Sequence, residues 1–382
     1  MTGAICTYRQ HLAATVKKAG SSRMGTWGGW FTPHSAAAAR AILERVPLVD
    51  LTLEVRDARI PLSSAFQPLT QDSFSRRRII LLNKLDLADH AQTERWIDSF
   101  KEKNCICFGV NSHNKGSIRE LINFVRARIK ELKAGDSGHT ATVMLVGIPN
   151  VGKSAIANAM HQIGRISAEE KGKLRHAIVS STPGDTKDIR SYKIASHPNI
   201  YVLDTPGILF PEIADAHAAS NLALTGAIKD SLVGECALAQ YFLSVLNSNE
   251  EYKKWESLSG HAKENSAQKR GQYPSDHTQD FVVWDVRRTL FETISSFGRR
   301  CLEEEVEMGR LIELQFAALH EDFRIPADDT DGYRTVALKL LNLFRTGRLG
   351  RYTLDPIPQV SDDHSLIHPP NISPSDFPSQ NI

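Results

Sequence analysis

The chain has 382 residues, enough for about two to three domains with buried cores. Its 46 basic residues nearly balance 44 acidic ones, which argues against nucleic-acid binding through overall charge and leaves only local patches. The five cysteines lack the spacing of a disulfide scaffold, and no apolar run reaches the roughly 18 residues that span a bilayer. We therefore expect a soluble protein of a reducing compartment.

The N-terminal segment is basic, rich in Ala, Ser and Thr, and contains no acidic residue before Glu44. Such a composition is typical of a mitochondrial or chloroplast transit peptide. Residues 8–19 could form a basic amphipathic helix within it. We therefore interpret residues 1–26 as a transit peptide or a disordered leader. The expected location is the mitochondrial matrix, with the chloroplast as the alternative.

Short apolar, β-rich runs then alternate with helical patterns. Strands are expected at 49–55, 78–82, 105–110, 141–146, 189–194 and 200–203, and helices at 35–46, 93–101, 117–133 and 155–160. This alternation predicts an α/β domain over 27–230, with a mostly parallel sheet and helices on both faces. Ligands of such sheets bind beyond the carboxyl ends of the strands.

The remainder of the chain is helical in pattern. Helices are expected at 213–224, 232–246, 281–297, 306–323 and 333–344. We therefore predict a small all-helical C-terminal domain at 231–352, with a polar insertion at 247–279. Residues 353–382 are rich in Pro, Ser and Asp and are expected to be a disordered tail.

The residues from Gly147 to Ser154 fit the phosphate-binding loop pattern G-x-x-x-x-G-K-[ST] and lie between an expected strand and helix. In such a loop, successive backbone N–H groups and the helix N-terminus bind phosphate. We expect Lys153 to reach the β- and γ-phosphates and the Ser154 hydroxyl to ligate Mg²⁺. Val151, Gly152 and Ala155 complete the expected contacts of this loop.

Asn83-Lys84-Leu85-Asp86 stands at the end of another expected strand and predicts a guanine-binding site. A carboxylate such as that of Asp86 accepts hydrogen bonds from guanine N1–H and the 2-amino group, neither of which adenine offers. Asn83 and Lys84 would support the loop and the ring. Asn111 and Ser112 would form the loop that contacts the guanine carbonyl.

Asp204-Thr205-Pro206-Gly207 ends a further expected strand. Asp204 would hold Mg²⁺ through a water molecule, and the Gly207 N–H would contact the γ-phosphate. Thr186 lies in a Gly-, Pro- and Thr-rich stretch and is a candidate Mg²⁺ ligand of a switch loop. Ser181 and Thr182 are alternatives to it.

The base-recognition motif here precedes the phosphate-binding motifs, the reverse of the order in a conventional small GTPase. Such an order can arise by circular permutation of the same sheet. Trp30-Phe31 with Pro33-His34, Asp57-Ala58-Arg59-Ile60-Pro61 and the motifs above occur in the order of the circularly permuted ribosome-assembly GTPases. The chain most resembles their mitochondrial GTPase 1 type, over about residues 27–245. The expected fold is therefore a circularly permuted P-loop GTPase domain followed by a helical domain.

The resemblance implies how GTP would be hydrolysed. Ile208 replaces the water-orienting Gln that many GTPases place after the D-x-x-G glycine. The family uses a monovalent cation, often K⁺, for which Asn150 is the candidate ligand here. His34 is the candidate for activating water, although a plain surface histidine is the alternative. Asp57 and Arg59 are expected to brace the fold.

The resemblance also implies a partner, the large ribosomal subunit, on which a monomeric GTPase would act as an assembly factor. Candidate contacts to rRNA phosphates are Arg287, Arg288, Arg299, Arg300, Arg345, Arg348 and Arg351. The alternatives are a slowly hydrolysing GTP-regulated scaffold that protein partners read, and the same type of enzyme in the chloroplast or nucleolus. The sequence leaves peripheral membrane association open.

Overall fold

A computed structural model describes residues 3–20, 30–69, 77–133, 140–168, 188–196, 198–210, 212–213, 215–258, 276–297, 304–326 and 328–357. The chain forms two compact units. The sheet unit comprises Ala19–Ala214, Gly226–Lys229 and Tyr352–Ile382, and the helical unit comprises Met1–Lys18, Asp215–Thr225 and Asp230–Arg351. In the part of the chain that is described, no helix is both long and apolar enough to cross a membrane.

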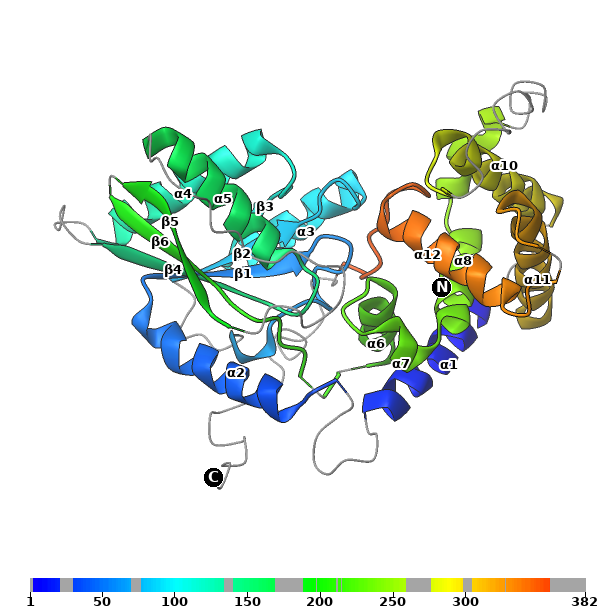
Figure 1. Ribbon diagram of the computed structural model, residues 1–382, viewed down its shortest axis with the longest axis horizontal. Helices are drawn as coiled ribbons and strands as arrows, with labels where there is room; N and C mark the ends of the chain where they lie inside the picture. The colour runs from blue at the N-terminus through cyan, green and yellow to red at the C-terminus, as the bar shows by residue number, and fades with distance from the viewer. Residues whose placement is uncertain are drawn as a thin grey trace. The chain divides into compact units, whose positions relative to one another are not determined.

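The sheet unit is built on six strands in the order β3-β2-β1-β4-β6-β5 (Figure 1). They are β1 (Leu51–Asp57), β2 (Arg78–Asn83), β3 (Ile106–Gly109), β4 (Ala141–Val146), β5 (Arg190–Ser196) and β6 (Asn199–Asp204). The pairing is parallel except between β5 and β6. The mostly parallel sheet predicted from the sequence is therefore confirmed, and the carboxyl ends of β1, β2, β4 and β6 lie along one edge.

Helices cover both faces of this sheet, with α2 on one face and α4 and α5 on the other (Figure 1). The helical segments are α2 (Pro33–Arg45), α3 (His90–Glu102), α4 (Lys115–Leu132) and α5 (Lys153–Ala168), with the short turns η1 (Val46–Leu48) and η2 (Gln67–Leu69). Side-chain caps begin α3 and α4, where Asp89 and Asn114 accept backbone N–H bonds. The apolar face expected for α4 is buried: Ile118, Leu121, Ile122, Val125 and Ile129.

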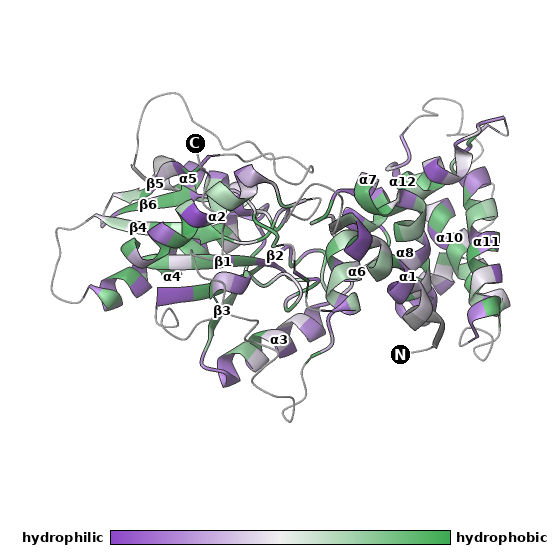
Figure 2. Ribbon diagram, turned by 90° about the horizontal axis from the view of Figure 1, so that it is seen from below, coloured by the Kyte–Doolittle hydropathy of each residue, from purple (hydrophilic) through white to green (hydrophobic). Residues whose placement is uncertain are grey.

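The helical unit contains α1 (Gly3–Gly20), α6 (Ala216–Leu224), α7 (Asp230–Val233), α8 (Glu235–Ser248), η4 (Glu251–Leu258), α10 (Asp280–Ser296), α11 (Glu305–Asp322) and α12 (Gly332–Arg345). Figure 2 shows strands in mostly hydrophobic colours, whereas the helices carry both hydrophobic and hydrophilic faces. Such amphipathic helices bury one stripe against their neighbours. The C-terminal region is thus helical, as the sequence predicts.

Helix α1 is a packed element of the helical unit. Leu12 and Val16 are almost fully buried, and Ser220 of α6 donates a hydrogen bond of 3.0 Å to the Arg9 carbonyl. Arg9 Nε lies 3.4 Å from the hydroxyl of Tyr241. The interpretation of residues 1–26 as a disordered leader therefore does not hold for residues 3–20. Their basic helical character is compatible with an import signal, which stays a prediction.

The end of the sheet unit and the start of the polar insertion also differ from those expected. Helix α6 belongs to the helical unit, so the first stretch of the sheet unit ends at Ala214 and not at residue 230. Of the residues from 215 to 230, only Gly226–Lys229 belong to the sheet unit. The expected insertion at 247–279 begins as the end of α8 and as η4, whose Trp255 is buried. The remaining residues up to 275 lie outside the described part.

The predicted start of the disordered tail, at residue 353, is also too early. Tyr352 and Asp355 are buried in the sheet unit, because backbone and carboxylate groups of this segment find hydrogen-bond partners there. Composition alone misses such an anchor. Residues 358–382 lie outside the described part.

Candidate nucleotide-binding site

The loop from Gly147 to Ser154 leaves the carboxyl end of β4 and enters α5. Gly152 has a φ of 96°, and a Cβ atom at this position would lie 2.2 Å from Asn83 Nδ2. At Gly147 a Cβ atom would lie 2.4 Å from the Val55 carbonyl oxygen. Both positions therefore require glycine, because the loop approaches the neighbouring strand ends too closely for a side chain.

Asn83 joins the loops that carry the sequence motifs. Its Nδ2 donates a hydrogen bond of 2.8 Å to the Val151 carbonyl, and its Oδ1 accepts one of 3.2 Å from the Ser112 N–H. Asn83 itself is fully buried. One side chain thus fixes the phosphate-binding loop and the Asn111-Ser112 loop against the end of β2, where the sequence places the base-recognition motif.

A buried ionic network anchors the base-recognition loop. Lys84, with a φ of 64°, places its Nζ 2.8 Å from Asp57 Oδ2. Arg59 donates to both oxygens of the same carboxylate, at 3.0 and 2.8 Å. Burial alone would raise the pKa of Asp57, but Arg59 and Lys84 hold it well below its usual range. The bracing role expected for Asp57 and Arg59 is confirmed.

Asp86 is exposed two residues beyond Lys84. Its neighbour Leu85 packs against the apolar cluster around Trp96 and Phe100 of α3, which anchors the loop. The carboxylate therefore stands in solvent on a loop whose preceding residues are fixed. Such a group can accept the hydrogen bonds of a planar ligand without a large cost in ordering.

Ser154 and Asp204 form the polar centre beside the phosphate-binding loop. The Ser154 hydroxyl donates a hydrogen bond of 2.8 Å to Asp204 Oδ2. Asp204 Oδ1 is buried, and the described residues offer it no hydrogen-bond partner. Burial raises the pKa of Asp204, an effect that the bond from Ser154 opposes. A hydroxyl and an unsatisfied carboxylate oxygen fit Mg²⁺, which prefers oxygen ligands. Thr186, the other expected ligand, lies outside the described residues.

Lys153 lies in the phosphate-binding loop itself. Its Nζ donates to the carbonyls of Gly147 and Ile148, at 3.1 and 2.8 Å. Burial lowers the pKa of Lys153 to about 8, with Asp204 opposing the shift and Lys84 adding to it. A buried ammonium group held by two carbonyls is a strong partner for a phosphate that displaces them.

Gly207 closes the site on the other side of Lys153. A Cβ atom at Gly207 would lie 2.6 Å from Pro149 Cα and 3.0 Å from Lys153 Nζ. The Ile208 N–H is 3.3 Å from the Gly147 carbonyl. The D-x-x-G segment therefore lies directly against the phosphate-binding loop, as its motif predicts.

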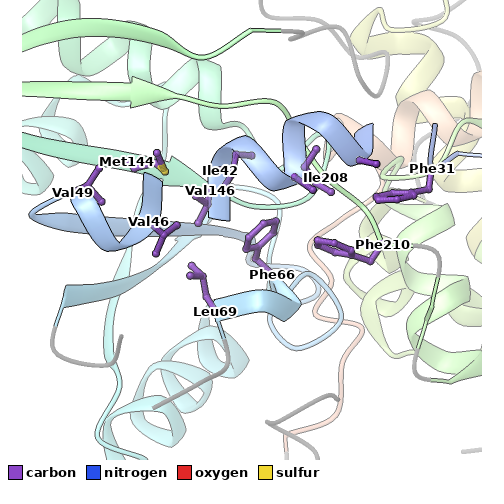
Figure 3. Close-up of a cluster of buried hydrophobic side chains, with 12 residues drawn as sticks. Phe31, Ile42, Val46, Val49, Phe66, Leu69, Met144, Val146, Ile208 and Phe210 are labelled. Carbon is purple, nitrogen blue, oxygen red and sulfur yellow. The ribbon is translucent and has the colours of Figure 1, made fainter. Parts of the chain in front are cut away.

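The side chain of Ile208 is buried in the core of the sheet unit. It belongs to a buried cluster with Ala36 and Ile42 of α2, Phe66 and Phe210 (Figure 3). No polar group thus follows Gly207 to orient a water molecule.

The segment around His34 begins in the same cluster. The rings of Phe31 and Phe210 are 5.8 Å apart, and Trp30 Nε1 lies 3.4 Å from the Phe210 carbonyl. These contacts tie the start of α2 to the segment after Gly207. His34 itself is exposed in the first turn of α2.

Asn150 occupies the left-handed region with a φ of 61°. Its Nδ2 donates a hydrogen bond of 2.7 Å to the Gly226 carbonyl. Sequence reasoning misses this contact, because Gly226 lies far along the chain and carries no motif. The bond orients the side-chain amide, whose Oδ1 is the atom that can ligate a cation.

The family described as 50S ribosome-binding GTPase matches residues 142–270. DAR GTPase 2, mitochondrial, from Arabidopsis thaliana is 54% identical over 351 residues, covering 88% of this chain and 93% of the relative. Ribosome biogenesis GTPase A from Bacillus licheniformis is 32% identical, covering 70% of this chain and 96% of the relative.

Among solved structures, GDP-bound YlqF from T. maritima aligns at 20% identity and a TM-score of 0.42, covering 82% of this chain and 98% of that chain. The class of protein is defined by the curated relatives, together with the phosphate-binding loop and the order of the nucleotide-binding motifs along the chain. The chain belongs to the circularly permuted ribosome-assembly GTPases, and it is a GTP-hydrolysing enzyme.

Proposed function

We propose that this GTPase assists assembly of the large ribosomal subunit in mitochondria and works as a monomer. The observation that carries the nucleotide-binding part of the proposal is the position of Asn83, which bridges the phosphate-binding and Ser112 loops in permuted order. The matched 50S ribosome-binding family and the mitochondrial name of the Arabidopsis relative support it. The acid-free N-terminal segment supports import into the matrix.

GTP would lie across the carboxyl edge of the sheet. Asp86 would accept the guanine N1–H and 2-amino hydrogen bonds, while Lys84 and the Ser112 loop flank the ring. The proposed base contacts are Asn83, Lys84, Leu85, Asp86, Asn111 and Ser112, and the proposed phosphate contacts are Asn150, Val151, Gly152, Lys153, Ser154, Ala155 and Gly207. The fixed positions of Asn83 and Gly152 support this arrangement.

Ser154 and Asp204 would hold Mg²⁺, with Thr186 as a further proposed ligand. When bound, the ion neutralises charge that develops on the β- and γ-phosphate oxygens. Lys153 would exchange its bonds to the Gly147 and Ile148 carbonyls for phosphate oxygens. The Gly207 N–H would donate to the γ-phosphate.

Hydrolysis by the protein alone should be slow, because Ile208 is buried and cannot orient water. We propose that K⁺, ligated by Asn150 Oδ1, supplies positive charge beside the phosphates. His34 would activate the water, and its attachment to the D-x-x-G segment through Trp30 and Phe31 supports this role. Phosphate release in K⁺ against Na⁺, with and without ribosomal subunits, tests the proposal. No turnover in any condition would favour the scaffold alternative.

The basic residues of the helical unit divide into two groups. Arg345 bonds to Asp230 and to carbonyls at the end of α6, and Arg288 is buried beside Asp285. Arg287 donates a hydrogen bond of 2.7 Å from its Nε to the Arg348 carbonyl. These three side chains have structural roles. Arg348 and Arg351 are exposed and are the better candidates for rRNA phosphates. Arg299 and Arg300 lie outside the described residues.

Co-sedimentation with mitochondrial large subunits tests the proposed function directly. The protein should sediment with them in the presence of a non-hydrolysable GTP analogue and leave them in GDP. Binding that is the same in both nucleotides would contradict the assembly role. A fluorescent fusion of residues 1–43 tests the location, because a chloroplast or nucleolar signal would replace the mitochondrial proposal.

A further inference from the structure

The segment Tyr352–Ile357, which we call the C-terminal strap, runs along the base-recognition side of the sheet unit. The Tyr352 N–H donates a hydrogen bond of 3.1 Å to the Leu87 carbonyl. The Leu354 N–H donates one of 2.7 Å to the Arg59 carbonyl. Tyr352 is almost fully buried, and Ile357 packs against the cluster that holds Leu85. The strap is therefore attached to two separate loops.

Asp355 provides the strongest of these attachments. Its Oδ2 accepts hydrogen bonds from the N–H groups of Leu62 and Ser63, at 2.8 and 2.7 Å. Its Oδ1 accepts one of 2.6 Å from the Ser63 hydroxyl. The residue is 1% exposed. A buried carboxylate is stable only with such donors, so it fixes the register of the strap on the 59–64 loop.

Both loops that the strap contacts are connected to the guanine-recognition residues. Leu87 directly follows Asp86 in the chain. Arg59 donates to the Asp57 carboxylate, which in turn accepts from Lys84 Nζ. The strap thus contacts the loop directly at Leu87, just after Asp86. It is also linked to Lys84, through Arg59 and Asp57.

Because Asp86 is exposed, its position depends on the residues that flank it in the chain. The residues before it are fixed by the buried side chain of Asn83 and by the bond between Lys84 and Asp57. The residue after it is fixed at Leu87, where the loop turns back with a bond of 2.9 Å from the Leu87 N–H to the Lys84 carbonyl. The Tyr352 N–H bond to the Leu87 carbonyl therefore holds the second end of the short segment that presents Asp86.

We propose that the C-terminal strap positions the guanine-recognition loop, with Asp355 as the positioning residue. This inference rests on the proposed role of Asp86 at guanine. Without the strap, the loop would keep its anchor at Asn83 but lose its support at Leu87 and at the 59–64 loop. The loss should affect contacts to the base more than contacts to the phosphates, which the loop after β4 makes.

The test compares binding of GDP and inosine diphosphate by the full chain and an Asp355→Ala variant. Inosine lacks the 2-amino group, so it would keep one of the two hydrogen bonds to Asp86. We expect the full chain to prefer GDP by about tenfold. In Asp355→Ala, GDP affinity should fall about tenfold and the preference should shrink to about threefold or less.

Asp50→Ala is the matched control. Asp50 Oδ2 also accepts a hydrogen bond from a backbone group, the Thr142 N–H at 2.8 Å. Asp50 directly precedes β1, however, and so lies at the amino ends of the strands, away from the site. Loss of this bond should leave the preference for GDP unchanged. An Asp355→Ala variant that weakens both nucleotides equally, or neither, would overturn the proposal.

Two milder variants serve if Asp355→Ala does not fold. Asp355→Asn keeps the shape of the side chain but loses its charge, and Ser63→Ala removes the donor to Oδ1. Either should reduce the preference for GDP in the same direction, and an unchanged preference in both would overturn the proposal. A full chain that binds GDP no better than ADP would instead reject the guanine site itself, independently of the strap.

Discussion

The two units of the chain bury polar groups of different kinds. In the sheet unit, several buried side chains are charged: Glu54, Arg56, Asp57, Arg59, Lys153, Asp204 and Asp355. In the helical unit, the buried polar side chains are mainly uncharged: Ser220, Asn221, Ser244, Asn247 and Gln315, with Asp285 and Arg288 as an ion pair. A buried charge costs free energy unless it is paired, so the sheet unit depends on its ion pairs more than the helical unit does.

The largest expected effect comes from breaking the network of the sheet unit. Asp57→Ala would leave Arg59 buried and without its carboxylate, and would release Lys84. We expect the free energy of unfolding to fall by about 3–5 kcal/mol. Chemical denaturation measures this change. A loss below about 1 kcal/mol, as for an exposed pair, would show that the network does not stabilise the unit.

The same carboxylate gives the sheet unit a dependence on pH. The folded-state pKa of Asp57 lies below its unfolded value, so its contribution is present above about pH 4 and is lost as pH falls towards the folded value. The free energy of unfolding should therefore decline between about pH 5 and pH 2. Asp57→Asn should decline less steeply over this range. Parallel slopes for the two proteins would contradict the assigned shift.

Breaking the uncharged pair of the helical unit should cost less. Asn247 and Gln315 exchange two hydrogen bonds, of 3.0 and 2.8 Å. Asn247→Ala leaves the buried Gln315 amide without this partner and should cost about 1–3 kcal/mol. A double change of both residues to Leu should cost less than the single change, because no polar group then stays unpaired. A cost equal to that of Asp57→Ala would erase the contrast between the units.

The smallest effect is expected at the surface of the helical unit. Arg345 is one-quarter exposed and bonds to Asp230 and the Leu224 carbonyl, so Arg345→Ala should lower the free energy of unfolding by about 1 kcal/mol. Arg348 pairs with the exposed Asp280. Arg348→Ala should therefore change the free energy of unfolding by less than about 0.5 kcal/mol. If the ribosome contact is correct, the second variant should still weaken subunit binding.

The parts of the fold that the sequence predicts are those with local signals. Period-two and period-3.6 patterns locate the strands of the sheet and helices such as α4, and the phosphate-binding loop requires its glycines for steric reasons that any chain would share. The motif order then leads to a permuted sheet. Asn83, Ser112 and Val151 meet as these motifs require.

Other contacts have no local signal. Asp355 lies in a Pro- and Asp-rich segment that composition describes as disordered, and its partners Leu62 and Ser63 are nearly 300 positions away. The packing of α1 is hidden in the same way, because a basic amphipathic helix suits both an import signal and a domain surface. Tertiary contacts of long sequence separation decide such cases, and a single sequence does not reveal them.

We propose that a loop placed before the phosphate-binding loop in the chain recognises guanine through Asp86. An Asp86→Asn variant tests it, because the Asn amide can donate to the 2-oxo group of xanthine but offers guanine a mismatched partner. Equilibrium binding should show GDP affinity lowered by about 100-fold and xanthosine diphosphate bound in its place. A variant that keeps its preference for GDP would contradict the claim.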